Sequence, residues 1–136
     1  MSLSNEERKD IVIYRTEKSY KAFEQARLNA GIKCWEVVAS RLYYSAYYAV
    51  SALLIAEGYT TKTHEGIINS FSLHFIKEGL VPKEMGRLYR NLFALRLSGG
   101  YEDHFDAEEA DVVPLIEPTK QLIDFIITKA RNKMNV

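Results

Sequence analysis

Apolar residues recur along this chain at the three- and four-residue spacing of amphipathic helices, and polar or glycine-containing stretches separate the apolar segments. The first segment predicts a helix over residues 5–29. Ser4 precedes it as the N-cap and Glu7 stands in its first turn, which is the pattern of a capping box, and Gly31 ends it. Its apolar positions form an irregular stripe, made of Ile11, Ile13, Tyr14, Tyr20, Phe23 and Leu28.

The second segment predicts a helix over residues 33–57, stopped by Gly58. Two neighbouring apolar stripes run along it. The first consists of Trp35, Val38, Leu42, Ala46, Ala49 and Leu53, and the second of Tyr43, Tyr47, Val50 and Leu54. A helix that is apolar on most sides is buried, so this helix is expected at the centre of the fold.

Three more helices are expected. One covers residues 64–77 after the cap residue Thr63, and one covers residues 83–97, ended by the pair Gly99-Gly100. The last begins at a capping box of Asp106 and Glu109 and runs to residue 133. Two prolines, at 114 and 118, either bend it or divide it into a short and a longer helix. No segment alternates like a strand, so we predict an all-α, up-and-down bundle of about five helices, one domain over residues 1–136.

The charge balance argues against a broad nucleic-acid surface and for self-association. Lys and Arg together number 18, as do Asp and Glu, so the formal net charge is zero. A wide nucleic-acid footprint normally shows a basic excess. Zero net charge also lowers the electrostatic barrier to association. Together with the apolar second helix, this predicts a homodimer.

Cysteine and histidine usage exclude several kinds of site. Cys34 is the only cysteine, which excludes a disulfide within the chain and suits a reducing compartment. The three histidines, His64, His74 and His104, lack the spacing of metal ligands. Phosphate-loop and dinucleotide-binding motifs are absent from the sequence. We therefore expect no metal and no cofactor.

The polar start of the sequence is unlike a signal peptide, and no apolar run approaches the roughly 20 residues that span a bilayer. This predicts a cytoplasmic protein without a membrane partner.

Arg41, Tyr44 and Tyr48 fall on one line of the second predicted helix. A guanidinium suits a phosphate and phenol rings suit bases or ribose, so this stripe is a candidate ligand groove. The alternative is structural. Arg41 would then form an internal ion pair, and the tyrosines would pack in the core or at a dimer seam, since tyrosine is frequent at interfaces.

His64 is a candidate ligand contact or base at the start of the third predicted helix. A positive charge is disfavoured at a helix N-terminus, which favours the neutral imidazole. The alternative is a helix-start residue that bonds a backbone or carboxylate group.

Arg96, Tyr101 and His104 cluster around the glycine pair. An arginine beside a histidine can cleave RNA without a metal: the histidine assists the 2′-hydroxyl or the leaving oxygen, and the arginine stabilises the phosphorane charge. The alternative pairs Arg96 with Glu102, Asp103 or Asp106 and leaves His104 exposed.

Three segments together resemble the HEPN domain, in particular its small stand-alone prokaryotic branch. They are Arg41-Leu42-Tyr43-Tyr44-Ser45-Ala46-Tyr47-Tyr48-Ala49, Lys62-Thr63-His64-Glu65-Gly66, and Arg96 with Tyr101. A helix containing Phe71 and Phe75 stands between the last two segments. The resemblance covers nearly the whole chain, from about residue 5 to residue 133.

The resemblance implies a dimeric helical bundle that is often paired with a minimal nucleotidyltransferase in toxin–antitoxin systems. It also implies, for catalytic members, a metal-independent endoribonuclease in which four to six residues separate an arginine from a histidine. Here seven residues separate Arg96 from His104, and Tyr101 stands nearer the expected place of the histidine.

The first functional hypothesis is therefore a binding module for a nucleotide-like ligand or a partner nucleotidyltransferase or antitoxin protein, with Arg41, Tyr44, Tyr48, His64 and Tyr101 as ligand contacts. The second is an endoribonuclease toxin that uses Arg96 and His104 on RNA. The third is a purely structural dimeric scaffold.

Overall fold

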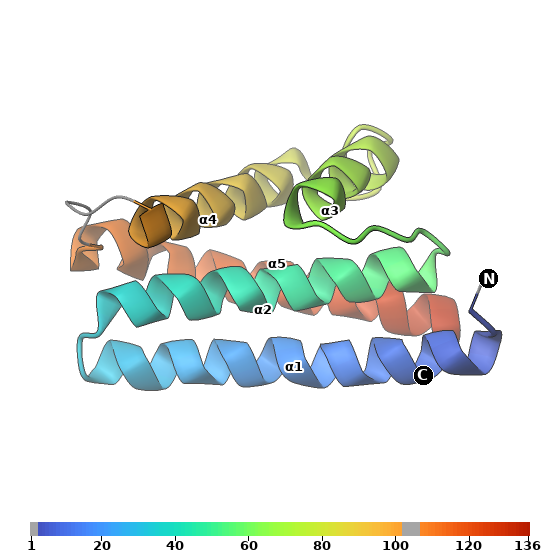
Figure 1. Cartoon of the computed structure of the whole chain (residues 1–136), viewed down its shortest axis with the longest axis horizontal. Helices are drawn as coiled ribbons and strands as arrows, with labels where there is room; N and C mark the ends of the chain where they lie inside the picture. The colour runs from blue at the N-terminus through green and yellow to red at the C-terminus, as the bar shows by residue number, and fades with distance from the viewer. Residues whose placement is uncertain (1–2, 102–106) are drawn as a thin grey trace.

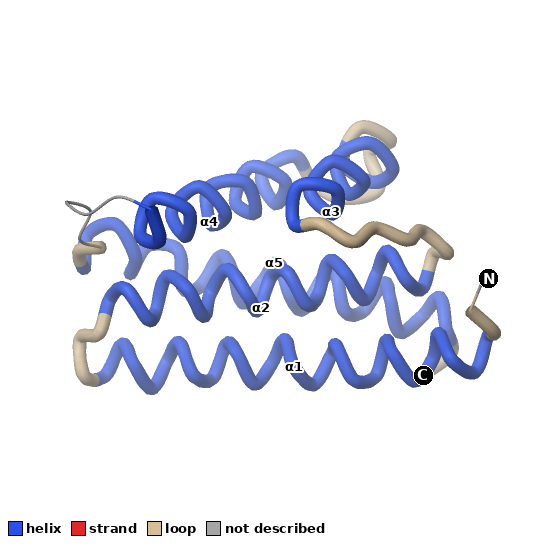
Figure 2. The backbone as a smooth tube through the Cα atoms, viewed as in Figure 1, coloured by secondary structure: helices blue, strands red, loops and turns tan. Residues whose placement is uncertain are grey.

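The computed structural model describes residues 3–101 and 107–136. Over these ranges the chain forms five α-helices and one π-helical turn, with no strand (Figure 2). The elements are α1 (Asn5–Gly31), α2 (Trp35–Ala56), α3 (His64–Phe71), the π-helical turn η1 (Ser72–Ile76), α4 (Lys83–Tyr101) and α5 (Glu109–Met134). The all-α bundle predicted from the sequence is confirmed, whereas the single domain over residues 1–136 stays a prediction.

Helix α2 is the centre of the bundle, as its apolar composition predicts. It contacts α1, α3, α4 and α5. In Figure 1 the long helices α1 and α2 run side by side, and α3 and α4 lie along the opposite side of α2. The fully buried residues of α2 supply much of the core: Val38, Leu42, Tyr43, Ala46, Ala49, Val50, Leu53 and Leu54.

The predicted capping box of α1 is present. The Ser4 hydroxyl accepts from the Glu7 backbone at 3.1 Å, and the Glu7 carboxylate accepts from the Ser4 backbone at 3.0 Å. Helix α2 begins at Trp35 rather than Lys33, because Lys33 has a φ of 60°, in the left-handed region. Gly58, with a φ of 88°, turns the chain away after α2.

Besides the start of α2, the predicted ends of the third and fourth helices are wrong. The third predicted helix is α-helical only to Phe71 and continues as the π-helical turn η1, which sequence propensity does not signal. Helix α4 continues through Gly99 and Gly100 to Tyr101, because glycine lowers helix propensity by only about 1 kcal/mol and does not forbid the conformation.

Of the two readings offered for the last helix, the undivided one is confirmed: α5 is one continuous helix through Pro114 and Pro118. It begins at Glu109, and the Asp111 carboxylate accepts from the Glu108 backbone at 3.4 Å. The predicted cap residue Asp106 lies outside the described residues.

The predicted stripe of α1 is also wrong in part. Ile13, Tyr14, Tyr20 and Leu28 are exposed. The buried face of α1 is made instead by Val12, Thr16, Ser19, Ala22, Phe23 and Ala26. Small residues on this face let α1 approach α2 closely enough for the Ser19 hydroxyl to donate to the Ser45 carbonyl at 2.6 Å.

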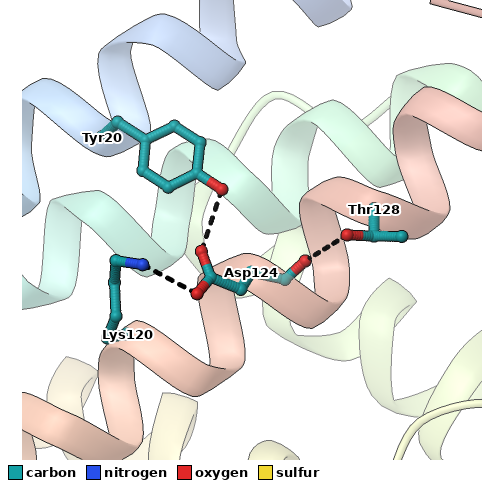
Figure 3. A network of polar contacts seen from close by, with 4 residues as sticks. All are labelled: Tyr20, Lys120, Asp124 and Thr128. Atoms are coloured by element: carbon teal, nitrogen blue, oxygen red, sulfur yellow. Dashed lines mark hydrogen bonds and ion pairs between the residues drawn. The ribbon is translucent and has the colours of Figure 1, made fainter.

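Polar side chains also fix α1 to its neighbours. The Tyr20 hydroxyl donates to the Asp124 carboxylate of α5 at 2.9 Å, and Lys120 pairs with the same carboxylate at 2.7 Å (Figure 3). Burial, with Asp124 contributing, raises the pKa of Tyr20 to about 12. Near the start of α1, the Arg8 guanidinium donates to the carbonyls of Ile55 and Ala56 at the end of α2.

Within the described ranges, no helix is both long enough and apolar enough to cross a bilayer.

Candidate functional site

The ring of Tyr44 lies against two guanidinium groups from different helices. The Arg41 guanidinium carbon is 5.0 Å from the ring centre, and that of Arg96 is 5.2 Å away. Both are cation–π distances. Arg96 also donates from Nη2 to the Tyr44 hydroxyl at 2.8 Å. Sequence positions 41, 44 and 96, far apart in the chain, therefore meet in one place.

Helices α1, α2 and α4 together position these two arginines. Arg41 and Tyr44 are three residues apart on α2, and α4 brings Arg96 across from above α2 (Figure 1). From α1, the Gln25 side-chain oxygen accepts from Arg41 Nη1 at 3.2 Å. Neither arginine forms an ion pair with a carboxylate of residues 3–101 or 107–136. The proposed internal ion pair of Arg41 is thus not made within that part of the chain.

Further aromatic rings pack against Tyr43, Tyr44 and His64. The imidazole of His64 stacks on Tyr47 with 4.5 Å between ring centres, and Tyr48 lies 6.2 Å from Tyr44. Phe93 of α4 lies 5.6 Å from Tyr43 and 6.4 Å from His64. Apart from the fully buried Tyr43, these rings are partly exposed. The site therefore offers aromatic faces as well as positive charge.

A hydrogen-bonded cap positions His64. Thr63 is the N-cap of α3, and its hydroxyl accepts from the Gly66 backbone at 2.9 Å. A Cβ atom at position 66 would stand 2.8 Å from that hydroxyl, so the cap requires glycine there. The structural role of the Lys62-Thr63-His64-Glu65-Gly66 segment is therefore to cap α3 and to place the imidazole at the start of that helix, facing α2.

The surroundings of His64 favour its neutral form. Its Nδ1 and the Tyr43 hydroxyl share a hydrogen bond of 2.5 Å. Burial, and then the nearby charge of Arg96, lower the pKa of His64 below its usual value. The neutral ring was predicted from the helix terminus, but its first cause is burial. Burial also raises the pKa of Tyr43, which keeps the phenol protonated; when that proton is donated to Nδ1, His64 Nε2 is the remaining N–H donor.

The structure brings together five of the seven predicted site residues: Arg41, Tyr44, Tyr48, His64 and Arg96. Tyr101 is the last residue of α4, and its side chain is not described. His104 lies outside the described residues, as do the acidic residues suggested as partners of Arg96.

Sequence reasoning missed four residues of the site, namely Gln25, Tyr43, Tyr47 and Phe93. Tyr43 and Tyr47 were assigned to an apolar stripe, although the density of tyrosines in that segment was a signal. Gln25 carries no sequence signal, because its role depends on how α1 packs against α2.

Across the described part of the chain, histidine, cysteine and carboxylate side chains nowhere gather in threes around a possible metal position. What this arrangement can do chemically is bind an anion. Two guanidiniums and an imidazole N–H donate hydrogen bonds, and aromatic faces are available for a planar group.

The sequence is similar to known proteins over most of its length. A UPF0332 protein of Thermotoga maritima is 31% identical over 120 residues, which cover 88% of this chain and 91% of that protein. A protein of Methanocaldococcus jannaschii named "Putative toxin" is 28% identical over 94 residues, 69% of each chain. A second protein of that organism with the same description is 25% identical over 100 residues, covering 74% of this chain and 68% of its own length.

The model of the HEPN domain family matches residues 13–131, which include every described residue of the candidate site. The chain therefore belongs to the HEPN domain family.

Proposed function

We propose that this HEPN protein is a binding module that holds the phosphate of a nucleotide-like ligand between Arg41 and Arg96. The observation that carries the proposal is the convergence of both guanidiniums on the ring of Tyr44, without a carboxylate partner in the described ranges. Both arginines are partly buried, and bringing two like charges together is unfavourable unless an anion compensates them. A phosphate accepts bidentate hydrogen bonds from guanidinium groups.

The aromatic rings support a nucleotide rather than a bare anion. Tyr47 and His64 stack on each other, and Tyr48 lies beside Tyr44, so partly exposed rings border the two charges. Bases and ribose pack on aromatic faces, and each stacked base contributes about 1–3 kcal/mol in single-stranded complexes.

Calorimetric titration of the purified protein with ribose 5-phosphate tests this proposal, because that ligand has the phosphate and sugar without a base. Binding is expected in the wild type and lost in Arg41→Ala and in Arg96→Ala. Arg87→Ala is the matched control, since Arg87 lies on the exposed side of α4 beside Glu84. Binding that survives both site substitutions would contradict the proposal.

In the cell, this module acts in the cytoplasm as the toxin of a toxin–antitoxin pair. Two relatives carry "toxin" in their names, and the family resemblance indicates a nucleotidyltransferase as the partner or antitoxin. Induced expression of the chain alone is expected to slow growth, and Arg96→Ala is expected to relieve the effect. If the wild type and Arg96→Ala slowed growth equally, the phosphate site would have no role in toxicity.

The proposal includes a homodimer, which follows from zero net charge and the family resemblance. Light scattering of the purified protein is expected to give twice the mass of the chain. Only monomer at working concentrations would contradict this expectation.

A metal-independent endoribonuclease is the second candidate. The observation that favours it is that the imidazole of His64 lies in the same cluster as Arg96. To serve as the base at Nε2, His64 would carry its proton on Nδ1 and donate it to the Tyr43 hydroxyl. In such a reaction a base takes the proton of the ribose 2′-hydroxyl, whose oxygen attacks phosphorus. The 5′-oxygen of the next nucleotide leaves with a proton, and Arg96 stabilises the negative phosphorane.

The ribonuclease reading is tested by incubating RNA with the protein in EDTA. Arg96→Ala is expected to abolish cleavage, and His104→Ala and His64→Ala identify which histidine moves the proton. Cleavage that remains after each of the three substitutions would exclude this mechanism.

A further inference from the structure

A groove opens between α3 and α4 beside Phe93 of the candidate site. The proposed phosphate site does not use the polar side chains of this groove. The groove has a volume of about 220 Å³, and it is lined by Glu65, Ile68, Asn69, Arg90 and Phe93. Ligand pockets for drug-sized molecules begin at about 300 Å³, so this groove suits a single planar fragment.

The groove is continuous with the candidate site through Phe93. This ring lines the groove and also lies 6.4 Å from His64 and 5.6 Å from Tyr43. Phe93 and Arg96 are three residues apart on α4, as are Arg90 and Phe93, so neighbours on the helix surface lead from the groove to the phosphate position. A ligand that places a phosphate at Arg96 can therefore extend past Phe93 into the groove.

The floor and rim of the groove have the chemistry of a base-binding pocket. Ile68 is buried and Phe93 is partly buried, so they form an apolar wall. Arg90 is anchored by donating to the Ser72 hydroxyl at 2.9 Å, and a guanidinium plane packs well on a flat ring.

Besides Arg90, the polar groups of the groove are Glu65 and Asn69, one helical turn apart on α3. Neither side chain makes a hydrogen bond or ion pair within residues 3–101 and 107–136. A side-chain amide pairs with N6 and N7 of adenine, and a carboxylate accepts from an exocyclic amine. Uracil presents an acceptor oxygen where adenine presents its amine, and a carboxylate repels such an oxygen.

From this juxtaposition we infer that the α3–α4 groove binds the adenine base of the ligand whose phosphate lies between Arg41 and Arg96. The inference rests on the proposed function and makes it more specific: the ligand is an adenine nucleotide, or an adenine-containing residue of an RNA. Asn69 and Glu65 recognise the base edge, and Phe93 and Arg90 hold its plane.

Calorimetric titration of the full chain with three ligands tests this inference: adenosine monophosphate, uridine monophosphate and ribose 5-phosphate. Adenosine monophosphate is expected to bind about tenfold more tightly than ribose 5-phosphate, since a base adds stacking and hydrogen bonds. Uridine monophosphate is expected to bind less tightly than adenosine monophosphate. In Asn69→Ala, the affinity for adenosine monophosphate is expected to fall severalfold while that for ribose 5-phosphate stays unchanged.

The control is Asn132→Ala, because Asn132 is likewise an exposed helical asparagine but lies at the far end of α5. Glu65→Gln is a second test. In this variant the ratio of the affinities for adenosine monophosphate and uridine monophosphate is expected to fall. Equal, arginine-dependent binding of all three ligands would overturn the adenine groove and leave the phosphate site standing. Absence of binding by every ligand would overturn the proposed function, and this inference with it.

Discussion

The Arg96 guanidinium donates a 2.8 Å hydrogen bond to the Tyr44 hydroxyl, and its carbon lies 5.2 Å from the centre of the same ring. Tyr44 of α2 therefore contacts Arg96 of α4 through both its hydroxyl group and the face of its ring. Arg41, on the same helix as Tyr44, uses the same ring at 5.0 Å. Tyr44 is the residue on which the geometry of the candidate site depends most.

Tyr44→Phe separates the two ways in which this residue holds Arg96. The substitution keeps the ring and removes the hydroxyl, so a hydrogen bond of about 1 kcal/mol is lost. We expect ribose 5-phosphate to bind about fivefold more weakly, a smaller loss than in Arg96→Ala. Calorimetry measures both. Tyr14→Phe is the control, because Tyr14 is 58% exposed on α1, and an equal effect there would contradict the assignment.

His64 makes the stability of the protein depend on pH. Burial and Arg96 lower its pKa in the folded state below the unfolded value of 6.5, so the unfolded chain binds more protons in acid. Its contribution is therefore complete above that value and is lost as the pH falls through the folded pKa. The urea midpoint is expected to fall between about pH 7.5 and pH 5.5. His64→Asn should flatten this dependence and His74→Asn should not; a slope unchanged in His64→Asn would refute the explanation.

The cap of α3 predicts coupling between Thr63 and Gly66. Gly66→Ala places a Cβ atom 2.8 Å from the Thr63 hydroxyl, whereas Gly31→Ala meets nothing within 4 Å. Alanine favours a helix, so Gly31→Ala measures that benefit alone. Gly66→Ala is expected to be less stable than Gly31→Ala by about 1 kcal/mol, the typical value of an N-cap.

A double-mutant cycle in urea checks this coupling. In a Thr63→Ala background the hydroxyl is gone, so Gly66→Ala should lose its penalty. An unchanged penalty in that background would show that the clash is not with the cap.

Arg8 is expected to contribute more to stability than any surface arginine in an ion pair. Its guanidinium donates to two carbonyls at the end of α2, where a helix leaves carbonyls without intrahelical partners; the Ile55 carbonyl also accepts from the Gly58 backbone at 3.0 Å. Arg8→Met should lower the free energy of unfolding by about 1–2 kcal/mol. Arg27→Met, which breaks only the exposed pair with Glu24, should cost less than about 0.5 kcal/mol. Equal losses in urea denaturation would contradict this role.

Local chemistry made the helices of this chain predictable, and tertiary packing decided the rest. The Ser4–Glu7 capping box and the turn at Gly58 depend on neighbouring residues only, so both could be predicted. The π-helical turn η1 could not, since it depends on packing: a Cβ atom at Gly86 of α4 would lie 3.0 Å from Ile76.

The candidate site shows the same division. The line of Arg41, Tyr44 and Tyr48 follows from helical spacing within one segment. The meeting of Arg96 with Tyr44, and of Gln25 with Arg41, requires three helices to pack, which no single segment encodes.

The convergence of two guanidiniums on Tyr44 has a consequence for the whole molecule. The chain has zero formal net charge, yet it concentrates two positive groups around a single ring. In the folded chain both guanidiniums lie within about 5 Å of the same ring centre, and the anion that we propose to bind there would reduce their mutual repulsion. An anion that binds only the folded state stabilises it, so under this proposal the protein should melt at a higher temperature in phosphate buffer than in a buffer of equal ionic strength without phosphate.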